Sequence, residues 1–457
     1  MPVINDLLKM RQYFETGVTK PFSFRKEQLG KLKQAVIKNE QAIQTALYKD
    51  LKKSPEETWV TETGLLLSEI SYTLDHLHQW IDADKVNTNL LNLPSKSYIV
   101  KEPLGTVLII GPWNYPLNLL FIPLAGAIAA GNCVVLKASE FAPATAAVMK
   151  QIITDIFDEQ YVLFSEGDGA TVITEMMNNF VFDHVFYTGS TAVGKIIYQM
   201  AAKNLVPVTL ELGGKSPCIV EEDANITVAA KRIAAIKFLN AGQTCIAPDY
   251  VLVHASKKDA LVTALKKTIL QFMGSDAKDS YDFGRIINNK QFDRLITYLQ
   301  QGSIVAGGKT DKAQLYIEPT LIENTLLDSP IMKEEIFGPI LPIISFTTMS
   351  EAKTIIAKNP NPLAFYLFTS SNKKEREWID AIPFGGGCIN NAAWHLTNHA
   401  LPFGGRGFSG TGSYHGKFSF DTFSHKKAIL KTPTWFDPAA KYPSYKGKLK
   451  IFKWLIK

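Results

Sequence analysis

The chain has 457 residues, of which 46% are hydrophobic and 20% are charged, and its net charge is +6. This length exceeds what one ordinary hydrophobic core covers, so it predicts two or three domains. The composition excludes a disordered or fibrous protein. The mild charge, together with the lack of zinc-ligand spacing or an aromatic-basic module, favours neither nucleic-acid binding nor a metal site.

The four cysteines are far apart in the sequence and form no Cys-x-x-Cys pair; they are Cys133, Cys218, Cys245 and Cys388. Such usage is typical of a reducing compartment. The first residues contain no basic region followed by an apolar one, so no secretion signal is expected there. These features predict a cytoplasmic protein.

Residues 5–83 are expected to form helices at the surface, because apolar residues recur at three- and four-residue spacing with charged residues between them. From Asp84 to Lys101 the chain becomes polar and extended. This change predicts a hairpin that projects from the body. Since edge strands seek partner strands, such an arm is suited to contact a second chain.

No charged residue occurs between Gly105 and Leu136, a length that would suffice for a membrane span. Prolines, glycines and asparagines interrupt this stretch, and they are costly in a lipid environment. The pattern instead predicts a buried unit of strand 106–110, helix 117–130 and strand 133–137.

Strand and helix patterns alternate from Gly105 to about Val220, which predicts a mostly parallel, doubly wound sheet. A second α/β region follows, with a long helix expected at 257–272 and a late strand at 424–431. Residues 188–194 form a Gly-rich turn before a helix, as dinucleotide-binding turns do. Thr191 replaces the second glycine of that fingerprint, so an ordinary strand-to-helix turn is the alternative.

Residues 238–245 have the sequence Phe-Leu-Asn-Ala-Gly-Gln-Thr-Cys and carry the best candidate nucleophile of the chain. A thiol reacts quickly even when only a few per cent is ionised. Gly242 allows a ligand to approach the backbone, and Asn240 and Gln243 are residues that a packed strand disfavours. A buried structural cysteine is the alternative interpretation of Cys245.

Two motifs in this order carry a specific resemblance. Residues 238–245 have the form Phe-x-Asn-x-Gly-Gln-x-Cys, and residues 210–217 are Leu-Glu-Leu-Gly-Gly-Lys-Ser-Pro. They resemble the signatures of the NAD(P)-dependent aldehyde dehydrogenases, most closely the class 3 and fatty aldehyde dehydrogenase branch. The resemblance covers nearly the whole chain and thins towards both ends.

The resemblance implies an α/β protein with a doubly wound cofactor-binding domain (a Rossmann variant), a second α/β catalytic domain and a β-arm for oligomerisation, which makes a homodimer. The expected boundaries are residues 1–83 and 102–211 for the dinucleotide-binding domain, 212–418 for the catalytic domain, 84–101 and 419–433 for the arm, and 434–457 for an amphipathic tail.

The same resemblance implies that Cys245 adds to an aldehyde, that Asn114 stabilises the oxyanion, and that Glu211 activates the water that hydrolyses the thioester. Cys245 would then need a lowered pKa, from backbone dipoles and a cationic nicotinamide ring, whereas apolar surroundings should raise the pKa of Glu211. The residues alone leave open a structural Asn114 in a turn and a Glu211 paired with Lys215.

NAD is the expected cofactor, with NADP as a second one that such enzymes accept. By resemblance, Lys137 and Glu140 contact the adenine-side ribose, where a carboxylate disfavours a 2′-phosphate. Glu335, or its neighbour Glu334, holds the nicotinamide ribose. The cofactor-binding residues expected are Trp113, Lys137, Glu140, Gly189, Ser190, Val193, Glu335 and Phe337.

Aromatic and aliphatic residues near these motifs are expected to line a substrate tunnel, with core packing as the alternative. They are Tyr115, Leu119, Thr244, Ile246 and Phe403, together with Trp113, Trp394 and His395. Such a lining favours medium- or long-chain aliphatic or aromatic aldehydes. Two other functions stay open: a thioester or ester hydrolase that uses Cys245 without redox chemistry, and a non-catalytic protein of the same fold.

The last segment, 441–457, places lysines at steps of four, three and four, at Lys446, Lys450, Lys453 and Lys457. In a helix they share one face, and apolar residues cover the rest. Such a segment suits a membrane interface, although it is too short to span a bilayer. Peripheral membrane contact through Lys446–Lys457 is therefore one expectation; packing on this chain or its partner, and disorder, are the others.

Overall fold

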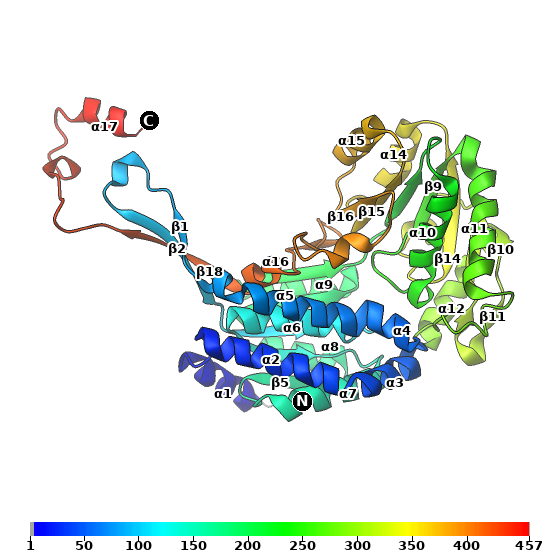
Figure 1. Cartoon of the computed structure of the whole chain (residues 1–457), viewed down its shortest axis with the longest axis horizontal. Coiled ribbons are helices and arrows are strands. Elements are labelled where there is room, and N and C mark those ends of the chain that lie inside the picture. Colours follow the sequence, from blue (N-terminus) through cyan, green and yellow to red (C-terminus); the bar gives the residue numbers. More distant parts are fainter. Residues whose placement is uncertain (1–3, 457) are drawn as a thin grey trace.

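Two largely parallel sheets form the two lobes of the molecule, and a slender β-arm extends from the first lobe (Figure 1). The structure is a computed structural model that describes residues 4–456. The predicted α/β class is confirmed. Within the described residues, no helix is both long and apolar enough to cross a membrane.

The first sheet has the strand order β17-β7-β6-β3-β4-β5. All neighbouring pairs are parallel except β17 with β7. The strands are β3 (Thr106–Ile110), β4 (Cys133–Lys137), β5 (Val162–Ser165), β6 (His184–Gly189), β7 (Val208–Leu212) and β17 (Gly410–Thr411). β3 and β4 are buried throughout, which confirms the strands predicted from the uncharged stretch.

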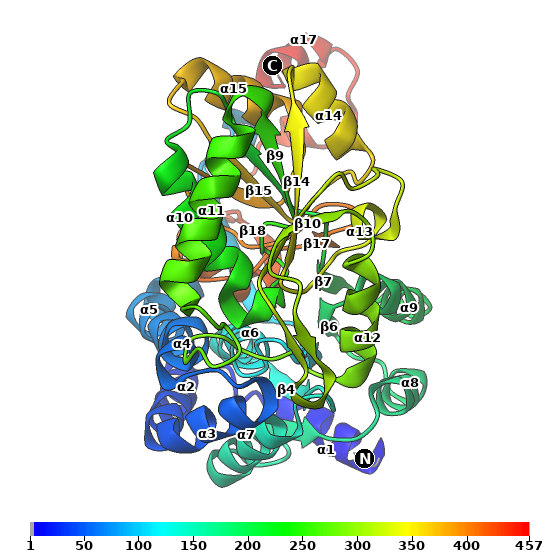
Figure 2. The ribbon, with the colours of Figure 1, turned by 90° about the vertical axis from the view of Figure 1, so that its right-hand side faces the viewer.

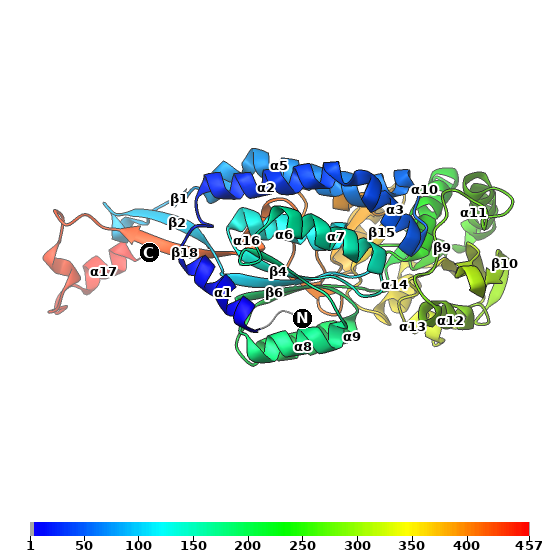
Figure 3. The ribbon, with the colours of Figure 1, turned by 90° about the horizontal axis from the view of Figure 1, so that it is seen from below.

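Helices cover both faces of this sheet. Figure 3 shows α6 and α7 on one face, α2 and α5 stacked outside them, and α8 and α9 on the other face. The bounds are α1 (Ile4–Glu15), α2 (Phe22–Lys38), α3 (Glu40–Leu51), α4 (Pro55–Thr58), a π-helix (Trp59–Thr63), α5 (Gly64–Ile81), α6 (Asn118–Ala130), α7 (Pro143–Ile156), α8 (Gly169–Asn179) and α9 (Thr191–Ala202). The helical layer predicted for residues 5–83 is thus confirmed.

The second sheet has the order β10-β13-β14-β9-β8-β15-β16, in which only β10 is antiparallel to its neighbour. Figure 2 shows α10 and α11 side by side next to its strands. The elements are β8 (Pro217–Val220), α10 (Ile226–Phe238), β9 (Tyr250–His254), α11 (Lys258–Met273), α12 (Asn289–Tyr298), β10 (Ser303–Ala306), β13 (Thr320–Glu323), α13 (Pro330–Lys333), β14 (Ile340–Phe346), α14 (Met349–Ala357), β15 (Ala364–Phe368), α15 (Asn372–Ala381) and β16 (Gly386–Ile389). Two short strands, β11 (Thr310–Asp311) and β12 (Tyr316–Ile317), form a separate pair.

The arm is a three-stranded antiparallel sheet of β1 (Asp84–Val86), β2 (Lys96–Pro103) and β18 (Ser424–Lys431). The predicted hairpin and the late strand therefore lie side by side. One position differs from the expected boundaries: β17 falls inside the range 212–418 but belongs to the first sheet. Pairing with the edge strand β7 draws it there, because an unpaired edge leaves backbone groups without partners.

The tail is less helical than its lysine spacing predicts. Up to residue 456, the tail has one short 3-10 helix (Ala439–Lys441) and one α-helix, α17 (Leu449–Leu455); Gly447, with a φ of +81°, prevents one continuous helix. Lys446 therefore lies outside the helix, and Lys457 lies outside the described residues. The apolar side chains of the tail are exposed in the single chain, with exposed fractions of 78% at Trp435 and 63% at Trp454.

Replacement of Gly131 by alanine is expected to destabilise the first lobe. Gly131 ends α6 with a φ of +95°, and a Cβ there would lie 2.9 Å from the Arg25 guanidinium carbon. Strain of this kind costs about 1–3 kcal/mol. Thermal unfolding should show a lower Tm for Gly131→Ala. Gly30→Ala is the control, since Gly30 lies within α2 with no atom within 4 Å of its Cβ position; an equal drop for both variants would contradict the explanation.

Candidate active site

The loop that carries Cys245 follows α10 in a strained conformation. Asn240 and Ala241 have φ values of +50° and +51°, and a Cβ on Gly242 would collide with the Gly338 carbonyl. The Gln243 side chain donates to the Arg285 and Asn240 carbonyls at 2.9 and 3.0 Å. The polar residues of the motif thus hold the loop backbone, which is why a packed strand is not formed here.

Asn114 reaches this loop from the segment after β3. Its amide Nδ2 donates to the Gln243 carbonyl at 3.0 Å, and its own carbonyl accepts from Asn240 Nδ2 at 2.8 Å. Asn114 is buried, with 3% of its surface exposed. Two segments 129 positions apart in the chain are therefore joined directly beside the thiol.

Glu211 lies on β7 and is 3% exposed. Within residues 4–456, neither of its carboxylate oxygens has a hydrogen-bond partner. Burial raises the pKa of this carboxyl well above its usual value, as its apolar setting predicts. The alternative pairing with Lys215 is wrong, because Lys215 Nζ contacts the Asp249 carboxylate and donates to the Glu334 carbonyl at 2.9 Å.

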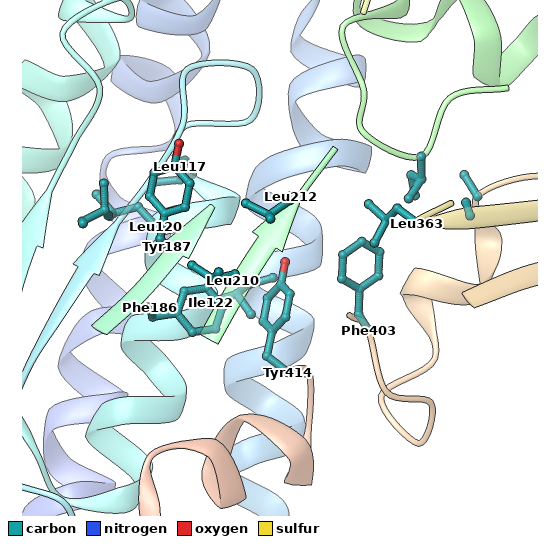
Figure 4. Close-up of a cluster of buried hydrophobic side chains, with 14 of the residues drawn as sticks. Leu117, Leu120, Ile122, Phe186, Tyr187, Leu210, Leu212, Leu363, Phe403 and Tyr414 are labelled. Atoms are coloured by element: carbon teal, nitrogen blue, oxygen red, sulfur yellow. The ribbon is translucent and has the colours of Figure 1, made fainter. Parts of the chain in front are cut away.

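These three groups line one cavity of about 260 Å³. The Cys245 thiol comes from the second lobe, whereas Glu211 and Asn114 come from the first sheet and the segment after β3. Figure 4 shows part of its apolar wall, with Leu212, Tyr414, Phe403 and Leu363; the rings of Tyr414 and Phe403 meet edge to face, with their centres 5.5 Å apart. The sulfur, carboxylate and amide can therefore contact a single bound molecule.

Five of the expected cofactor-binding residues line the same cavity: Trp113, Gly189, Ser190, Glu335 and Phe337. A Cβ on Gly213 would collide with the Glu335 carboxylate, so the backbone leaves room only for a glycine. Oε1 of Glu335 is buried without a partner among the described residues. An unpaired acceptor of this kind fits the hydroxyl groups of a ribose, so the site fits NAD(P).

The structure distinguishes Glu335 from Glu334. Glu334 accepts a hydrogen bond from the Tyr298 hydroxyl at 2.7 Å and faces away from the cavity, whereas Glu335 lines it. Burial, with the nearby Asp249 charge as a second cause, raises the pKa of Glu335 to about 8. Phe337 has a φ of +50°, and its ring meets the Trp113 ring edge-on at 5.3 Å.

Three expected cofactor-binding residues lie outside this cavity, at the carboxyl edge of the first sheet. Lys137 Nζ pairs with Glu140 at 3.3 Å, and Glu140 Oε1 accepts from the Gly169 N–H at the start of α8. Val193 lies in the first turn of α9, where its N–H is capped by the Ser190 hydroxyl. Ligands of open parallel sheets bind along this edge.

Gln291 and Arg294 of α12 also line the cavity, and the sequence analysis missed them. Arg294 donates to the carbonyls of Glu335 and Ile336 at 3.1 and 2.7 Å, so it holds the segment that presents Glu335. No local pattern marks these two residues, because polar residues on an amphipathic helix normally face solvent.

A second, apolar cavity of about 140 Å³ meets the first at Cys245, Leu119, Phe403 and Tyr414. Its wall contains six of the eight residues expected there: Tyr115, Leu119, Thr244, Ile246, Trp394 and Phe403. Trp113 lines the first cavity instead. The Tyr115 hydroxyl is 2.5 Å from Thr244 Oγ1. The expectation for His395 is wrong, since its ring stacks on Phe403 at 6.1 Å from behind and its Nδ1 lies 3.5 Å from Cys388 Sγ.

The thiol of Cys245 has a pKa of about 12, which is raised rather than lowered. Burial is the main cause, and the charges of Glu335 and Glu211 add to it; the N–H groups of Cys245 and Ile246 act in the opposite direction. The lowered pKa expected from the sequence is therefore absent from the protein in this state. Backbone dipoles alone do not offset the loss of solvation.

This raised pKa predicts slow alkylation of Cys245 by iodoacetamide in the ligand-free protein. The thiolate is the reacting form, so the rate should increase about tenfold for each unit between about pH 7 and 9. Mass spectrometry of the peptide that contains Cys245 measures the rate, and Cys245→Ala identifies labelling of other cysteines. A rate that levels off below about pH 8 would show that the thiol pKa is not raised.

The aldehyde dehydrogenase family matches residues 8–429 of the chain. The chain is 50% identical over 449 residues to 4,4′-diaponeurosporen-aldehyde dehydrogenase of Staphylococcus aureus, covering 98% of this chain and 97% of the relative. It is 43% identical to aldehyde dehydrogenase family 3 member A2 of Macaca fascicularis, covering 93% and 87%. The solved structure of the substrate-bound state of Staphylococcus aureus AldH matches with a TM-score of 0.97 at 48% identity, covering all of both chains. The chain belongs to the aldehyde dehydrogenase family.

Proposed function

We propose that this aldehyde dehydrogenase oxidises aldehydes with long apolar or aromatic chains to carboxylic acids, with Cys245 as its nucleophile. The family uses NAD(P) for this reaction. The observation that supports the assignment is the meeting of two cavities at one thiol. The first is lined by polar groups suited to NAD(P), and the second presents an almost entirely apolar surface.

The first half-reaction is assigned to Cys245 and Asn114. The Cys245 thiol loses its proton, the thiolate sulfur forms a C–S bond with the aldehyde carbon, and the carbonyl electron pair moves to the oxygen. The Asn114 amide and the Cys245 N–H donate to this oxyanion and stabilise it. When bound, NAD(P) accepts the hydride that leaves the carbon, and its cationic ring favours the thiolate form of the sulfur.

The second half-reaction is assigned to Glu211. The loss of hydride leaves a thioester on Cys245, which needs a water molecule with increased nucleophilicity. The Glu211 carboxylate accepts a proton from that water as the oxygen attacks the thioester carbon. The C–S bond breaks, the carboxylic acid leaves and the thiol is restored. Burial raises the pKa of Glu211, and a carboxylate with a raised pKa is a stronger base towards this water.

The substrate class follows from the apolar cavity. Its wall offers hydroxyl groups only at Tyr115, Tyr414 and a few threonines, and Tyr115 is already paired with Thr244. A small polar aldehyde would lose its hydration there without replacement, whereas a long chain gains about 0.8 kcal/mol for each buried CH₂ group. The name of the Staphylococcus aureus relative, a diaponeurosporen-aldehyde dehydrogenase, agrees with a long apolar substrate.

NAD is the preferred cofactor in this proposal. The Glu140 carboxylate lies at the sheet edge assigned to the adenine-side ribose, where it would repel a 2′-phosphate. Lys137 pairs with Glu140 at 3.3 Å and reduces that repulsion, so NADP is accepted at lower affinity.

The second candidate function, ester or thioester hydrolysis without redox, uses the same thiol and is tested by the same experiments as the first.

Replacement of Glu211 by glutamine is expected to separate the two half-reactions. Stopped-flow absorbance of NADH with an aliphatic aldehyde series should show a burst of about one NADH per chain, followed by slow turnover, because only thioester hydrolysis needs the base.

Replacement of Asn114 by alanine should lower kcat about 10²–10³-fold, because the oxyanion loses one of its two donors. In the parent enzyme, kcat/KM should increase with chain length.

Cys245→Ala is the control, and it should form no NADH at all. Turnover of an activated ester by the parent protein without NADH from any aldehyde would establish the hydrolase instead. If Glu211→Gln loses the burst as well as turnover, Glu211 is needed before the thioester forms, which would contradict its assignment to hydrolysis alone.

We also propose that the protein is a cytoplasmic homodimer whose tail contacts a membrane surface. Support comes from the arm, whose strand β18 offers a free edge to a partner strand. The tail combines exposed Trp435, Trp454 and Ile456 with lysines, which is the composition of interfacial segments.

Removal of residues 434–457 is expected to abolish binding to anionic phospholipid vesicles and to preserve the dimer. Flotation with vesicles measures the first property, and light scattering during gel filtration measures the second. Equal flotation of the full and shortened chains would end the membrane proposal. A monomer in both forms would end the proposed role of the arm.

A further inference from the structure

A buried ion pair lies directly behind the active-site loops. Lys53 and Glu62 both have side chains with 0% exposure, and Lys53 Nζ is 2.7 Å from Glu62 Oε1. Lys53 follows α3, and Glu62 lies in the π-helix 59–63. Burying two charges has a desolvation cost that can exceed the energy gained from their attraction. The pair is therefore weak evidence for stability, and a functional role is the other explanation for it.

The same ammonium group contacts the segment that carries the proposed oxyanion donor. Lys53 Nζ donates to the Asn114 carbonyl at 2.9 Å and lies 3.9 Å from the centre of the Tyr115 ring. The Asn114 carbonyl has a second donor, Asn240 Nδ2, at 2.8 Å. Two donors on one carbonyl oxygen restrain the plane of this peptide, and thereby the direction in which the Asn114 side chain leaves the backbone.

The carboxylates around Lys53 hold the neighbouring backbone. Glu62 Oε2 accepts from the N–H groups of Leu117 and Asn118 at 3.1 and 3.0 Å, so it caps the start of α6. Glu57 Oε1 accepts from the Asn240 N–H at 2.9 Å, at the strained start of the Cys245 loop. One cluster thus contacts both the Asn114 segment and the loop that ends at the nucleophile.

We propose that Lys53, held by Glu62, is a positioning residue that sets the geometry of the oxyanion site formed by Asn114 and the Cys245 N–H. The inference rests on the proposed function of Asn114. Lys53 does not line either cavity at the thiol and contacts no substrate; it acts through the Asn114 carbonyl. A displacement of the donor amide by about 1 Å is enough to cost about 10²-fold in rate.

The test is a double-mutant cycle on kcat with NAD and octanal. Lys53→Met should lower kcat about 10–100-fold and leave the KM values for aldehyde and NAD within about threefold, because the lost interaction matters only in the transition state. In an Asn114→Ala background, the same substitution should change kcat by less than about threefold, since the donor that Lys53 orients is already gone.

Additive effects, or an unchanged kcat in Lys53→Met, would overturn the inference. If either result is found while the parent enzyme still oxidises octanal in a reaction that needs Cys245, only the role of Lys53 is wrong and the proposed function stands. If no parent turnover is seen, the failure belongs to the proposed function instead. Lys374→Met is the matched control: it breaks the ion pair with the buried Glu221 at 2.8 Å, remote from both cavities, and should leave kcat unchanged.

The unpaired Glu62 left by Lys53→Met is a risk to folding, because removing one partner of a buried pair leaves an uncompensated buried charge. The double variant Lys53→Met/Glu62→Gln removes both charges and keeps an acceptor for the α6 N–H groups. It should fold and show the same fall in kcat with unchanged KM. A folded double variant with parental kcat would equally overturn the proposal.

Discussion

The hydrogen bond from Asn114 to the Gln243 carbonyl joins the two lobes at the point where the chemistry takes place. One side of it is the segment after β3 of the first sheet, and the other is the loop that ends in Cys245. Together with the bonds from Asn240 Nδ2 to the Asn114 carbonyl and from the Asn240 N–H to Glu57, it fixes the thiol and the amide relative to each other. The strained φ values of Asn240 and Ala241 are therefore tolerated, because the bond and its neighbours over-determine the loop.

Electrostatics at the site depend on how little water reaches it. Glu211 and Glu335 carry buried oxygens that find no partner in residues 4–456, and each carboxyl raises the pKa of Cys245. These groups are poorly solvated as long as only protein surrounds them, so each is ready to interact with a bound molecule. A cation placed among them would be attracted by both carboxylates and would stabilise the thiolate.

Much of this arrangement could be predicted from the sequence, and the limits have physical causes. The buried strands of the uncharged stretch and the Cys245 loop were marked by continuous apolar runs and by local motifs. Arg294, Gln291 and the Lys53–Glu62 pair were not, because their roles come from contacts between remote segments. The raised pKa of Cys245 was missed since burial, a property of the whole fold, outweighs the local N–H groups. His395 was expected in the tunnel wall because it follows Trp394 in the sequence. The side chains of neighbouring residues often point to different sides of the backbone, and only Trp394 reaches the cavity.

The two late strands have a consequence for synthesis of the chain. β2 pairs with β18 and β7 pairs with β17, so partners roughly 200 to 330 positions apart must meet. Until residues 410–431 have left the ribosome, both early strands keep an open flank able to recruit a foreign strand. A nascent chain that lacks these late strands is thus exposed to aggregation through its unpaired edges.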